Sequence, residues 1–256
     1  MMQATVVIVG LGEVGKPLLE IMKSGYQTFG VDINQAASVS ECDVMHICFP
    51  FQNGNFVGQV VEYIHQYRPA LTVINSTVAP GTTRRIAVEC GAAVVNSPVR
   101  GKHARMQEEM LRYTKFVGAL DLPSGQRAVE HFEEVGMKAE LLSSPEASEL
   151  AKLSETTYFG LLIAWAQEVE RYCDHLSLNY DEVVSIFEEI TFFPPVKYFP
   201  GIIGGHCVMP NIEILSRLGH SEFLHAIKWS NRNKTAREAR RIRDKLGAQA
   251  ARLKTL

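Results

Sequence analysis

The stretch Val6-Val7-Ile8-Val9-Gly10-Leu11-Gly12-Glu13-Val14-Gly15 decides the fold of this 256-residue chain. Four apolar β-branched residues lead into a Gly-x-Gly-x-x-Gly pattern, and apolar residues at helical spacing follow from Leu18 to Met22. The first glycine permits a tight turn, the second lets a pyrophosphate approach, and the third allows close helix–strand packing. The helix N-terminus binds phosphate through its unsatisfied N–H groups. The pattern therefore predicts a strand–turn–helix unit that binds a dinucleotide.

A carboxylate follows these glycines at the spacing that such a site needs. The second apolar run, Thr28-Phe29-Gly30-Val31, ends on Asp32, and an acid about 20 residues beyond the glycines hydrogen-bonds the adenosine ribose hydroxyls. An acidic side chain disfavours the extra phosphate of NADP, so we expect NAD as the cofactor. The residues assigned to cofactor binding are Gly10, Leu11, Gly12, Glu13, Val14, Gly15, Asp32, Pro50, Ser76 and Thr77.

Strands and helices alternate up to about residue 144. Apolar runs predict further strands at residues 43–49, 71–75, 92–96 and 114–118, and residues 58–67 predict a helix. This alternation is typical of an α/β protein with a doubly wound parallel sheet, the Rossmann fold. Ligands of such sheets bind beyond the carboxyl ends of the strands. The residues expected along that edge are Gly10, Asp32, Pro50, Thr77 and Pro98.

The pattern changes at Ser144-Pro145, where serine suits an N-cap and proline suits the first helical position. Apolar residues then keep a helical period to about Leu176, which predicts one helix of unusual length. Further helices are predicted over residues 181–190 and 210–218 and from about residue 222 onward. We therefore predict an NAD-binding Rossmann domain at 1–144 and an all-helical domain at 145–256. The long helix favours a spine between domains or a homodimer interface.

Composition narrows the classes of protein. The net charge of −2 gives no bias toward nucleic acid or anionic membranes, so we expect a small-molecule substrate. The five cysteines contain no Cys-x-x-Cys pair, which predicts no disulfide framework and no metal site and favours a reducing cytoplasm. A strand begins within a few residues of the start, so we expect no signal peptide. No apolar stretch is long enough to span a bilayer.

One thiol stands out near the end of the second half. The run Pro200-Gly201-Ile202-Ile203-Gly204-Gly205-His206-Cys207 puts Cys207 behind a glycine pair and just ahead of a predicted helix start at Pro210. Glycines let a substrate approach the backbone, and a helix N-terminus favours the thiolate. That arrangement describes an activated nucleophile, although a buried cysteine in a tight turn would give the same residues.

Together these segments carry a family resemblance. The chain resembles the nucleotide-sugar 6-dehydrogenases, the UDP-glucose and GDP-mannose dehydrogenase family, in order and approximate spacing from about residue 5 to 235. The matching stretches are Gly10-Leu11-Gly12-Glu13-Val14-Gly15, Ser76-Thr77-Val78-Ala79-Pro80-Gly81-Thr82-Thr83, Asn96-Ser97-Pro98, Glu149-Leu150-Ala151-Lys152-Leu153 and Gly204-Gly205-His206-Cys207.

The resemblance implies a reaction and a role for each matching residue. In that family NAD removes two successive hydrides and takes a primary alcohol through an aldehyde to a carboxylic acid. Cys207 would attack the aldehyde and carry it as a thiohemiacetal and then a thioester. Lys152 would stabilise oxyanion character on the substrate oxygen, and Thr77 would hold the water that relays a proton. The resemblance also implies a homodimer.

The chain departs from the family pattern at several places. Val99 stands where the family has a glutamate after Ser-Pro, and residues 100–104 form a shorter segment. Thr156 replaces an asparagine of the site and Asn211 replaces an aspartate, while the chain ends where the family begins a second Rossmann-like domain. A base for thioester hydrolysis is therefore missing. His103 and His206 are candidates to replace it, because histidine titrates near neutrality.

Three functions remain open on this evidence. The first is NAD-dependent oxidation of a sugar or nucleotide-sugar alcohol with Lys152 and Cys207. The second is a single-step oxidation with Lys152 alone, as in the 3-hydroxyisobutyrate and 6-phosphogluconate dehydrogenases, which the chain also resembles. The third is a catalytically degenerate paralogue that binds NAD or a nucleotide sugar. The nine basic residues between Asn231 and Leu256 suggest either a solvated helix or a surface that contacts a phosphate or a partner subunit.

Overall fold

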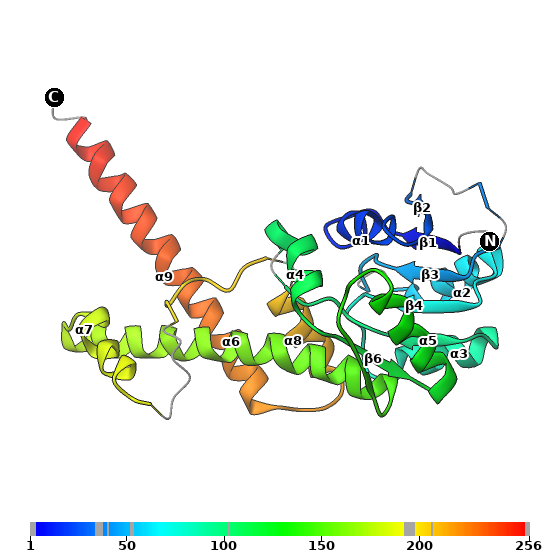
Figure 1. Cartoon of the computed structure of the whole chain (residues 1–256). Coiled ribbons are helices and arrows are strands. Elements are labelled where there is room, and N and C mark those ends of the chain that lie inside the picture. The colour runs from blue at the N-terminus through cyan, green and yellow to red at the C-terminus, as the bar shows by residue number, and fades with distance from the viewer. Residues whose placement is uncertain are drawn as a thin grey trace. The chain divides into compact units, whose positions relative to one another are not determined.

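The computed structural model describes residues 4–33, 38–39, 41–51, 54–101, 103–191, 198–205 and 207–253. The chain forms two compact units, Met1–Lys152 and Leu153–Leu256. Helix α6, Pro145–Leu176, begins in the first unit and continues into the second as one unbroken helix (Figure 1).

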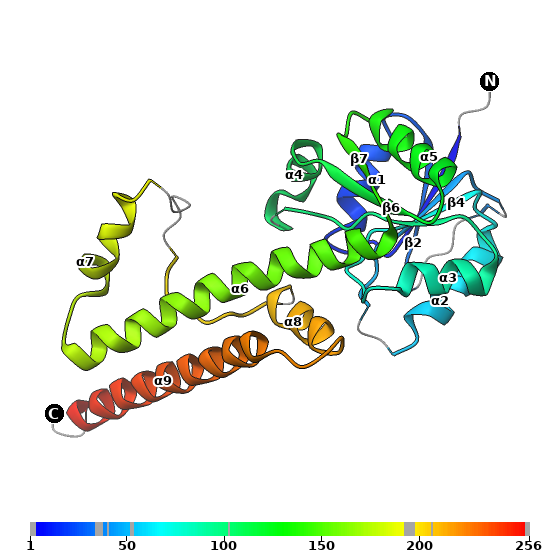
Figure 2. The same ribbon diagram turned by 90° about the horizontal axis from the view of Figure 1, so that it is seen from below.

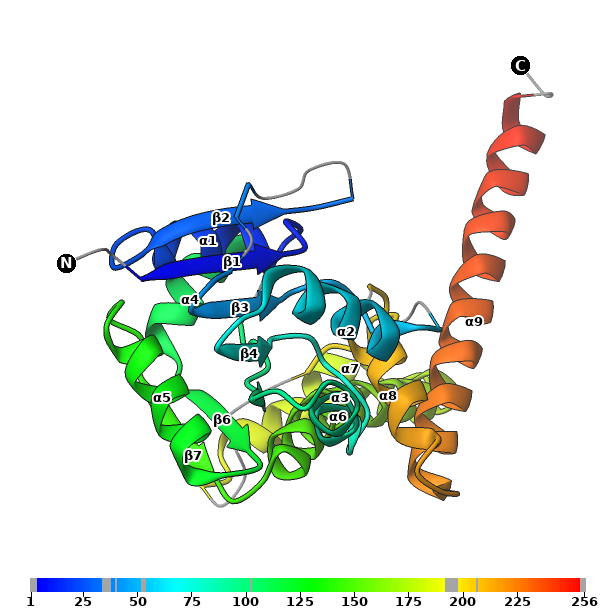
Figure 3. The same cartoon turned by 90° about the vertical axis from the view of Figure 1, so that its right-hand side faces the viewer.

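The first unit is built on a seven-stranded sheet of order β2-β1-β3-β4-β5-β6-β7, which Figure 3 shows with its strands side by side. The strands are β1 Thr5–Val9, β2 Gln27–Val31, β3 Val44–Ile47, β4 Leu71–Ile74, β5 Val94–Asn96, β6 Lys115–Ala119 and β7 Ala139–Leu142. The first five are parallel to one another. The strand order reverses between β1 and β3, and such a switch point opens the crevice where open α/β sheets bind ligands.

The predicted α/β fold is confirmed, but the sheet is not parallel throughout. Strand β6 pairs with β5 in the antiparallel direction, with Asn96 opposite Gly118, and β7 runs parallel to β6. The connection from β5 to β6 does not cross back to the opposite edge of the sheet. Strand β6 therefore starts at the edge where β5 ends, which brings its first residue, Lys115, to the carboxyl edge of the parallel strands.

Successive strand residues point to opposite faces of the sheet, so alternate residues pack into two apolar layers, one on each face. Val6, Ile8 and Val73 pack in the layer of α1, α4 and α5, whereas Val7 and Met45 pack in the layer of α2 and α3. The helices are α1 Gly15–Met22, α2 Phe56–Tyr67, α3 Thr82–Cys90, α4 Met106–Arg112 and α5 Leu122–Glu133, with a 3₁₀ turn at His103–Arg105. Figure 2 shows α1 and α5 on one side of the sheet and α2 and α3 on the other.

The second unit is helical, as predicted. It contains the greater part of α6, then α7 Tyr180–Ser185, a 3₁₀ turn at Ile186–Glu188, α8 Val208–Ser216 and α9 Glu222–Leu253. The predicted bounds of α6 and the predicted start of α9 are confirmed. The predicted start of α8 at Pro210 was wrong, because α8 begins at Val208 and Pro210 lies in its first turn. Proline is tolerated there because an N–H group in the first turn has no intrahelical partner.

The two compact units divide at residues 152 and 153, whereas the sequence-based division lies at 144 and 145, where α6 starts. The difference arises because the first two turns of α6 pack against the sheet. A Cβ atom at Gly118 of β6 would lie 2.5 Å from the carbonyl oxygen of Ser144 and 2.6 Å from Oγ of Ser148. A glycine in the strand is therefore what lets the helix approach so closely.

Two further findings concern the described residues alone. None of their helices combines the length and the hydropathy that crossing a membrane requires. Within the same residues, no three His, Cys, Asp or Glu side chains come together as a metal site.

Candidate active site and dinucleotide-binding edge

The glycine turn after β1 has one open and two crowded positions. A Cβ atom would lie 2.8 Å from the backbone nitrogen of Phe49 at Gly10 and 1.8 Å from the Gly10 carbonyl oxygen at Gly15. Gly10 also has a φ of +91°, which side chains rarely adopt. At Gly12 no atom lies within 4 Å of such a Cβ. The outer glycines are thus required by packing, and the middle one leaves the approach to the backbone open.

Asp32 follows β2 directly and is bound to this turn. Its Oδ2 accepts a hydrogen bond from the N–H of Leu11 at 3.1 Å, and its Oδ1 accepts one from the N–H of Ile33 at 2.8 Å. A carboxylate has about four lone-pair sites, so two remain for hydroxyl donors. The carboxylate therefore keeps a defined position beside the glycines with acceptor capacity to spare.

The remaining assigned cofactor residues lie along the same edge. Ser76, just beyond β4, donates from Oγ to the carbonyl of Phe49 at 2.6 Å, and this bond ties the loop after β4 to the loop after β3. Pro50 is exposed and Thr77 is half-buried. Val14 is the N-cap residue of α1. These positions follow from the parallel direction of β1 to β5, which brings their carboxyl ends to one side.

Glu149 connects α6 to the Ser-Thr-Val-Ala-Pro-Gly-Thr-Thr segment. Its buried carboxylate accepts hydrogen bonds from the N–H groups of Gly81 and Thr83, at 2.7 and 2.9 Å, and from the Thr83 hydroxyl at 2.7 Å. These groups form the N-terminus of α3, which favours a negative charge. Burial outweighs the hydrogen bonds and raises the pKa of Glu149. The glutamate thus acts as a helix cap supplied from another helix.

Lys152 owes its position to the same turns of α6. Ser148 hydrogen-bonds Oδ1 of Asn96 at the end of β5, and Glu149 holds the start of α3. Residues three and four apart share a helix face, so Lys152 lies on the face that Ser148 and Glu149 turn toward the sheet edge. Two of the matching sequence segments are therefore in direct contact with the segment that contains the lysine.

The position of the missing glutamate is part of the core. Val99 is 8% exposed and belongs to the apolar cluster with Val95 and Val117. No carboxylate can replace it there without a cost, because a charge would be buried without a partner. Of the two histidines expected to replace the base, the side chain of His103 and the whole of His206 lie outside the described residues.

Cys207 is the N-cap residue of α8 in the second unit, and its side chain is half-buried. The helix N-terminus predicted beside this thiol is therefore present, one residue beyond it. Asn211 of α8 donates from Nδ2 to Oγ1 of Thr156 on α6 at 3.0 Å. The two residues that differ from the family pattern in this unit thus bind each other.

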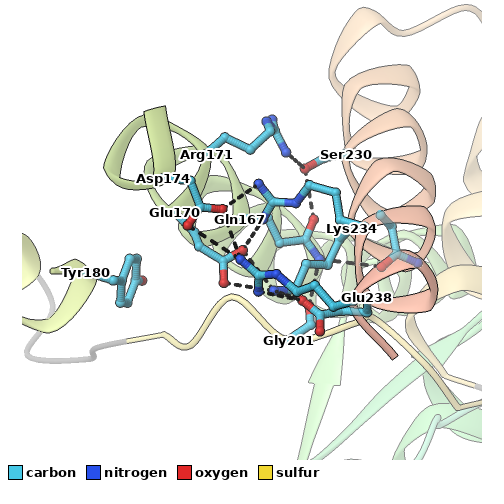
Figure 4. Close-up of polar contacts among 12 residues, drawn as sticks. Gln167, Glu170, Arg171, Asp174, Tyr180, Gly201, Ser230, Lys234 and Glu238 are labelled. Carbon is cyan, nitrogen blue, oxygen red and sulfur yellow. Dashed lines mark hydrogen bonds and ion pairs between the residues drawn. The ribbon is translucent and has the colours of Figure 1, made fainter. Parts of the chain in front are cut away.

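Two buried amides that sequence reasoning missed hold the loop before Cys207. Nε2 of Gln167 donates to the carbonyl of Gly201 at 2.7 Å, as Figure 4 shows. Asn231 binds both backbone groups of Ile203, accepting from its N–H at 2.8 Å and donating to its carbonyl at 2.9 Å. The sequence signal that could have identified Gln167 and Asn231 is a polar residue on the apolar face of a predicted helix.

The basic stretch of α9 is partly neutralised by α6. Figure 4 shows an array of ion pairs in which acids of α6 meet bases of α9. The pairs are Glu170 with Lys234 and Arg237, and Asp174 with Arg237 and Arg241. Lys234 and Arg241 also pair with Glu238 of α9 itself. Among the basic residues whose side chains the structure describes, Lys234, Arg237 and Arg241 therefore serve the packing of the helices.

Comparison with known proteins agrees with the sequence resemblance. Residues 146–235 match the family model for the UDP-glucose/GDP-mannose dehydrogenase family, central domain. A UDP-N-acetyl-D-mannosamine dehydrogenase of Methanococcus maripaludis is 23% identical over 281 residues, which cover 90% of this chain and 65% of that protein. The chain is therefore similar to nucleotide-sugar dehydrogenases, and its residues 146–235 carry the match to the family model. A UDP-N-acetyl-D-mannosamine dehydrogenase of Pyrococcus horikoshii is 26% identical, and the match covers 44% of that protein. The chain therefore spans 65% or less of the length of these two relatives.

Solved structures agree in fold. The UDP-D-ManNAc dehydrogenase of Pyrococcus horikoshii superposes with a TM-score of 0.83 at 19% identity and covers 96% of this chain and 72% of that one. The Mycobacterium tuberculosis 3-hydroxyisobutyrate dehydrogenase gives a TM-score of 0.72 at 17% identity and covers 91% of this chain and 94% of that one. At these identities the likeness concerns the fold alone.

Proposed function

We propose that this protein belongs to the nucleotide-sugar dehydrogenase family and is an NAD-dependent dehydrogenase that oxidises a primary alcohol of a sugar or nucleotide sugar toward a carboxylic acid. The observation that carries the proposal is the docking of α6 through Ser148 and Glu149, because it holds Lys152 at the carboxyl edge of the sheet. The glycine turn of Gly10–Gly15 belongs to the same edge. A cationic group and a dinucleotide site on one sheet edge are what alcohol oxidation by hydride transfer needs.

The described residues fit a bound NAD. The open backbone at Gly12 admits a pyrophosphate, and the start of α1 supplies N–H donors to it. The carboxylate of Asp32 has acceptor sites for ribose hydroxyls and would repel the 2′-phosphate of NADP. When bound, NAD supplies the hydride acceptor.

In the proposed chemistry the first oxidation removes a hydride and a proton from the alcohol. The Lys152 ammonium stabilises negative charge on the substrate oxygen, and Thr77 holds the water that takes the proton. In the second, the Cys207 thiolate adds to the aldehyde carbon, and loss of a hydride from the thiohemiacetal gives a thioester. Water then releases the acid and restores the thiol, so each substrate consumes two NAD and one water. A reducing cytoplasm, expected from the cysteine usage, would keep the thiol reduced.

A second candidate function is ligand binding without turnover. Val99 favours it, because an apolar residue in the core occupies the place where the resemblance expects the carboxylate for acid–base work. Asn211 favours it as well, since its amide is bound to Thr156. Thioester hydrolysis needs a base, and without one the chain could bind a nucleotide sugar and stop at the thioester.

The proposed homodimer is supported by α6 itself. Tyr158, Trp165 and Tyr172 are 55%, 55% and 56% exposed and follow one another at intervals of seven residues. Residues at that spacing share one helix face, so three aromatic rings form a stripe of the kind that a second copy of the chain would cover. Light scattering should give a dimer mass, and Trp165→Ala should shift the protein toward a monomer.

The proposed function is tested by counting NADH on a panel of UDP-sugars, GDP-sugars and simple sugars. We expect two NADH per substrate from the wild type and a loss of about 10⁴-fold or more in the complete reaction for Cys207→Ala. Lys152→Met should lower the rate about 10²- to 10³-fold. Cys90→Ala is the matched control, because Cys90 lies at the end of α3, away from the matching segments.

The alternatives give different outcomes in the same experiment. One NADH per substrate, unchanged by Cys207→Ala, would establish a single-step oxidation of the hydroxyacid type. No NADH from any substrate, with NAD binding confirmed by calorimetry, would establish the non-catalytic function. A stoichiometric first turnover that stalls with substrate bound to Cys207 would show that the missing base limits hydrolysis.

A further inference from the structure

A line of polar side chains crosses the apolar layer between the sheet and α5. It consists of Lys115 of β6, Asn75 after β4, His46 of β3 and His131 of α5, each of which is at most 4% exposed. The surrounding layer is apolar and includes Phe132 and Val73. Buried polar groups weaken a core unless they bind one another. Neither the sequence resemblance nor the proposed chemistry accounts for these four residues.

The hydrogen bonds along this line have one consistent direction. Oδ1 of Asn75 accepts from Nζ of Lys115 at 3.2 Å, so its Nδ2 is the donor toward Nδ1 of His46 at 3.1 Å. Nε2 of His46 must then carry the proton that it donates to Nε2 of His131 at 2.9 Å. Both imidazoles are neutral in this arrangement. Burial agrees, since it lowers the pKa of His46 well below its usual value and that of His131 to about 4.

The acceptors around Lys115 match an ammonium group. Its Nζ donates to Oδ1 of Asn75 and to the carbonyls of Ser97 and Pro98, which makes three acceptors for three N–H donors. It also lies 5.1 Å from the centre of the Phe132 ring, within range of a cation–π contact. A neutral amine has only two N–H donors and would leave one acceptor without a partner. Burial acts in the opposite direction and lowers the pKa of Lys115 to about 7.

The charged neighbours of Lys115 come from several elements. Burial lowers the pKa of Lys115 most, and Lys152 of α6 lowers it further, whereas Cys48 just after β3 would raise it only as a thiolate. The Cys48 thiol is itself neutral near pH 7, because burial raises its pKa to about 12. At the far end of the line, Arg127 lowers the pKa of His131, and Tyr26 donates to Glu134. Lys152 is therefore the charged group that shares the sheet edge with Lys115.

We propose that Lys115 is a positioning residue of the candidate site, whose ammonium holds the Ser97–Pro98 turn and adds a second positive charge beside Lys152. The reversed direction of β6 is what brings it to this edge. The turn that it holds follows Asn96, to which Ser148 binds α6. Loss of the Lys115 proton near neutral pH weakens the hold on the turn and removes one positive charge from the edge. Its effect on turnover rests on the proposed function.

The proton on Lys115 can be measured without any substrate. In protein labelled with ¹³C at lysine Cε, we expect one lysine resonance to titrate near pH 7. That resonance should be absent in Lys115→Met and present in Lys138→Met, a control at an exposed lysine. The proposal is overturned if no lysine resonance of the wild type titrates near pH 7, or if that resonance persists in Lys115→Met. This readout stands even if no substrate is turned over.

Kinetics then separate positioning from bulk structure. In the wild type we expect an inflection of kcat near pH 7 that Lys138→Met keeps and Lys115→Met loses. Below pH 7, Lys115→Met should lower kcat about tenfold, the effect of one pKa unit of interaction between the two charges. The KM of Lys115→Met for NAD should stay within about twofold of the wild-type value. The glycine turn that we expect to bind NAD follows β1, whereas Lys115 lies in β6. An unchanged kcat profile in a folded Lys115→Met protein would contradict the positioning role.

Discussion

Two glutamates of α6, Glu149 and Glu170, stabilise the segments around them through different kinds of contact. Glu149 is 1% exposed and binds two backbone N–H groups and a hydroxyl at the start of α3, with no cation among these partners. The side chain of Glu170 is 15% exposed and pairs with Lys234 and Arg237 of α9. The first glutamate completes a helix end whose N–H groups need an acceptor, whereas the second is one of several acids that share several bases.

The difference predicts how each region tolerates change. Around Glu170 the partners are shared, because Lys234 also pairs with Glu238 and Arg237 also pairs with Asp174. The donors that bind Glu149 do not share a second acceptor in this way. Loss of the Glu149 carboxylate therefore leaves buried donors unsatisfied. Buried unsatisfied donors cost far more than a lost exposed ion pair.

Glu149→Ala should destabilise the protein by about 3 kcal/mol, because it leaves the N–H groups of Gly81 and Thr83 without an acceptor. Chemical denaturation with matched m-values measures the loss. Glu146→Ala in the same helix turn is the control, since Glu146 pairs with Arg84 at the surface and its removal should cost less than about 1 kcal/mol. Equal losses for the two variants would contradict the role of Glu149 as a helix cap.

Acid should weaken the buried line of polar side chains in the first unit. Burial holds the pKa of His131 at about 4, below the ordinary 6.5, so the unfolded chain binds a proton that the folded chain refuses. Stability should therefore fall as the pH drops from about 6.5 to 4, by at most about 3 kcal/mol from this group. His131→Phe should flatten that part of the stability curve. A curve as steep as that of the wild type would place the titrating group elsewhere.

Glu170→Ala should cost about 1–2 kcal/mol, since the side chains of both Glu170 and Lys234 are largely buried but Lys234 keeps Glu238 as a partner. Thermal unfolding measures the change, and Glu189→Ala, at an exposed position after α7, serves as the control. A loss as large as that of Glu149→Ala would show that the array has no redundancy.

Arg241→Met should change stability by no more than about 0.5 kcal/mol, because its guanidinium is half exposed and its two acids retain other partners. The small difference between this variant and the wild type should disappear in 0.5 M salt, which screens exposed charges. A difference that persists at high salt would point to packing of the arginine stem and away from its charge.

Local patterns predicted the parts of this protein that local forces control. The Gly10–Gly15 turn and the bounds of α6 could be predicted from the sequence, because glycine spacing, an N-cap serine and a helical period act over a few residues. The position of Cys207 before a helix could be predicted for the same reason. The start of α8 was predicted two residues too late, at Pro210, because proline is common in the first turn of a helix. The family resemblance supplied the roles of Lys152 and Cys207, which stay predictions until the variants are measured.

Contacts between distant segments could not be predicted in this way. Nothing local distinguishes a β6 that runs antiparallel from one that runs parallel, yet that direction brings Lys115 to the end of β5. A lysine in one strand and a histidine in another give no sign that Asn75 connects them in the core. The same holds for Asn231, whose grip on Ile203 spans 28 residues of chain.

The sequence by itself determined the class of fold, the glycine turn after β1 and the resemblance to a family, because each depends on residue types at short, regular spacing. Only the tertiary structure decided which residues hold the candidate site together. Glu149, Gln167 and Lys115 act through partners that are distant along the chain. Such contacts form only when the folded chain removes their groups from water, and a buried polar group then needs those particular partners.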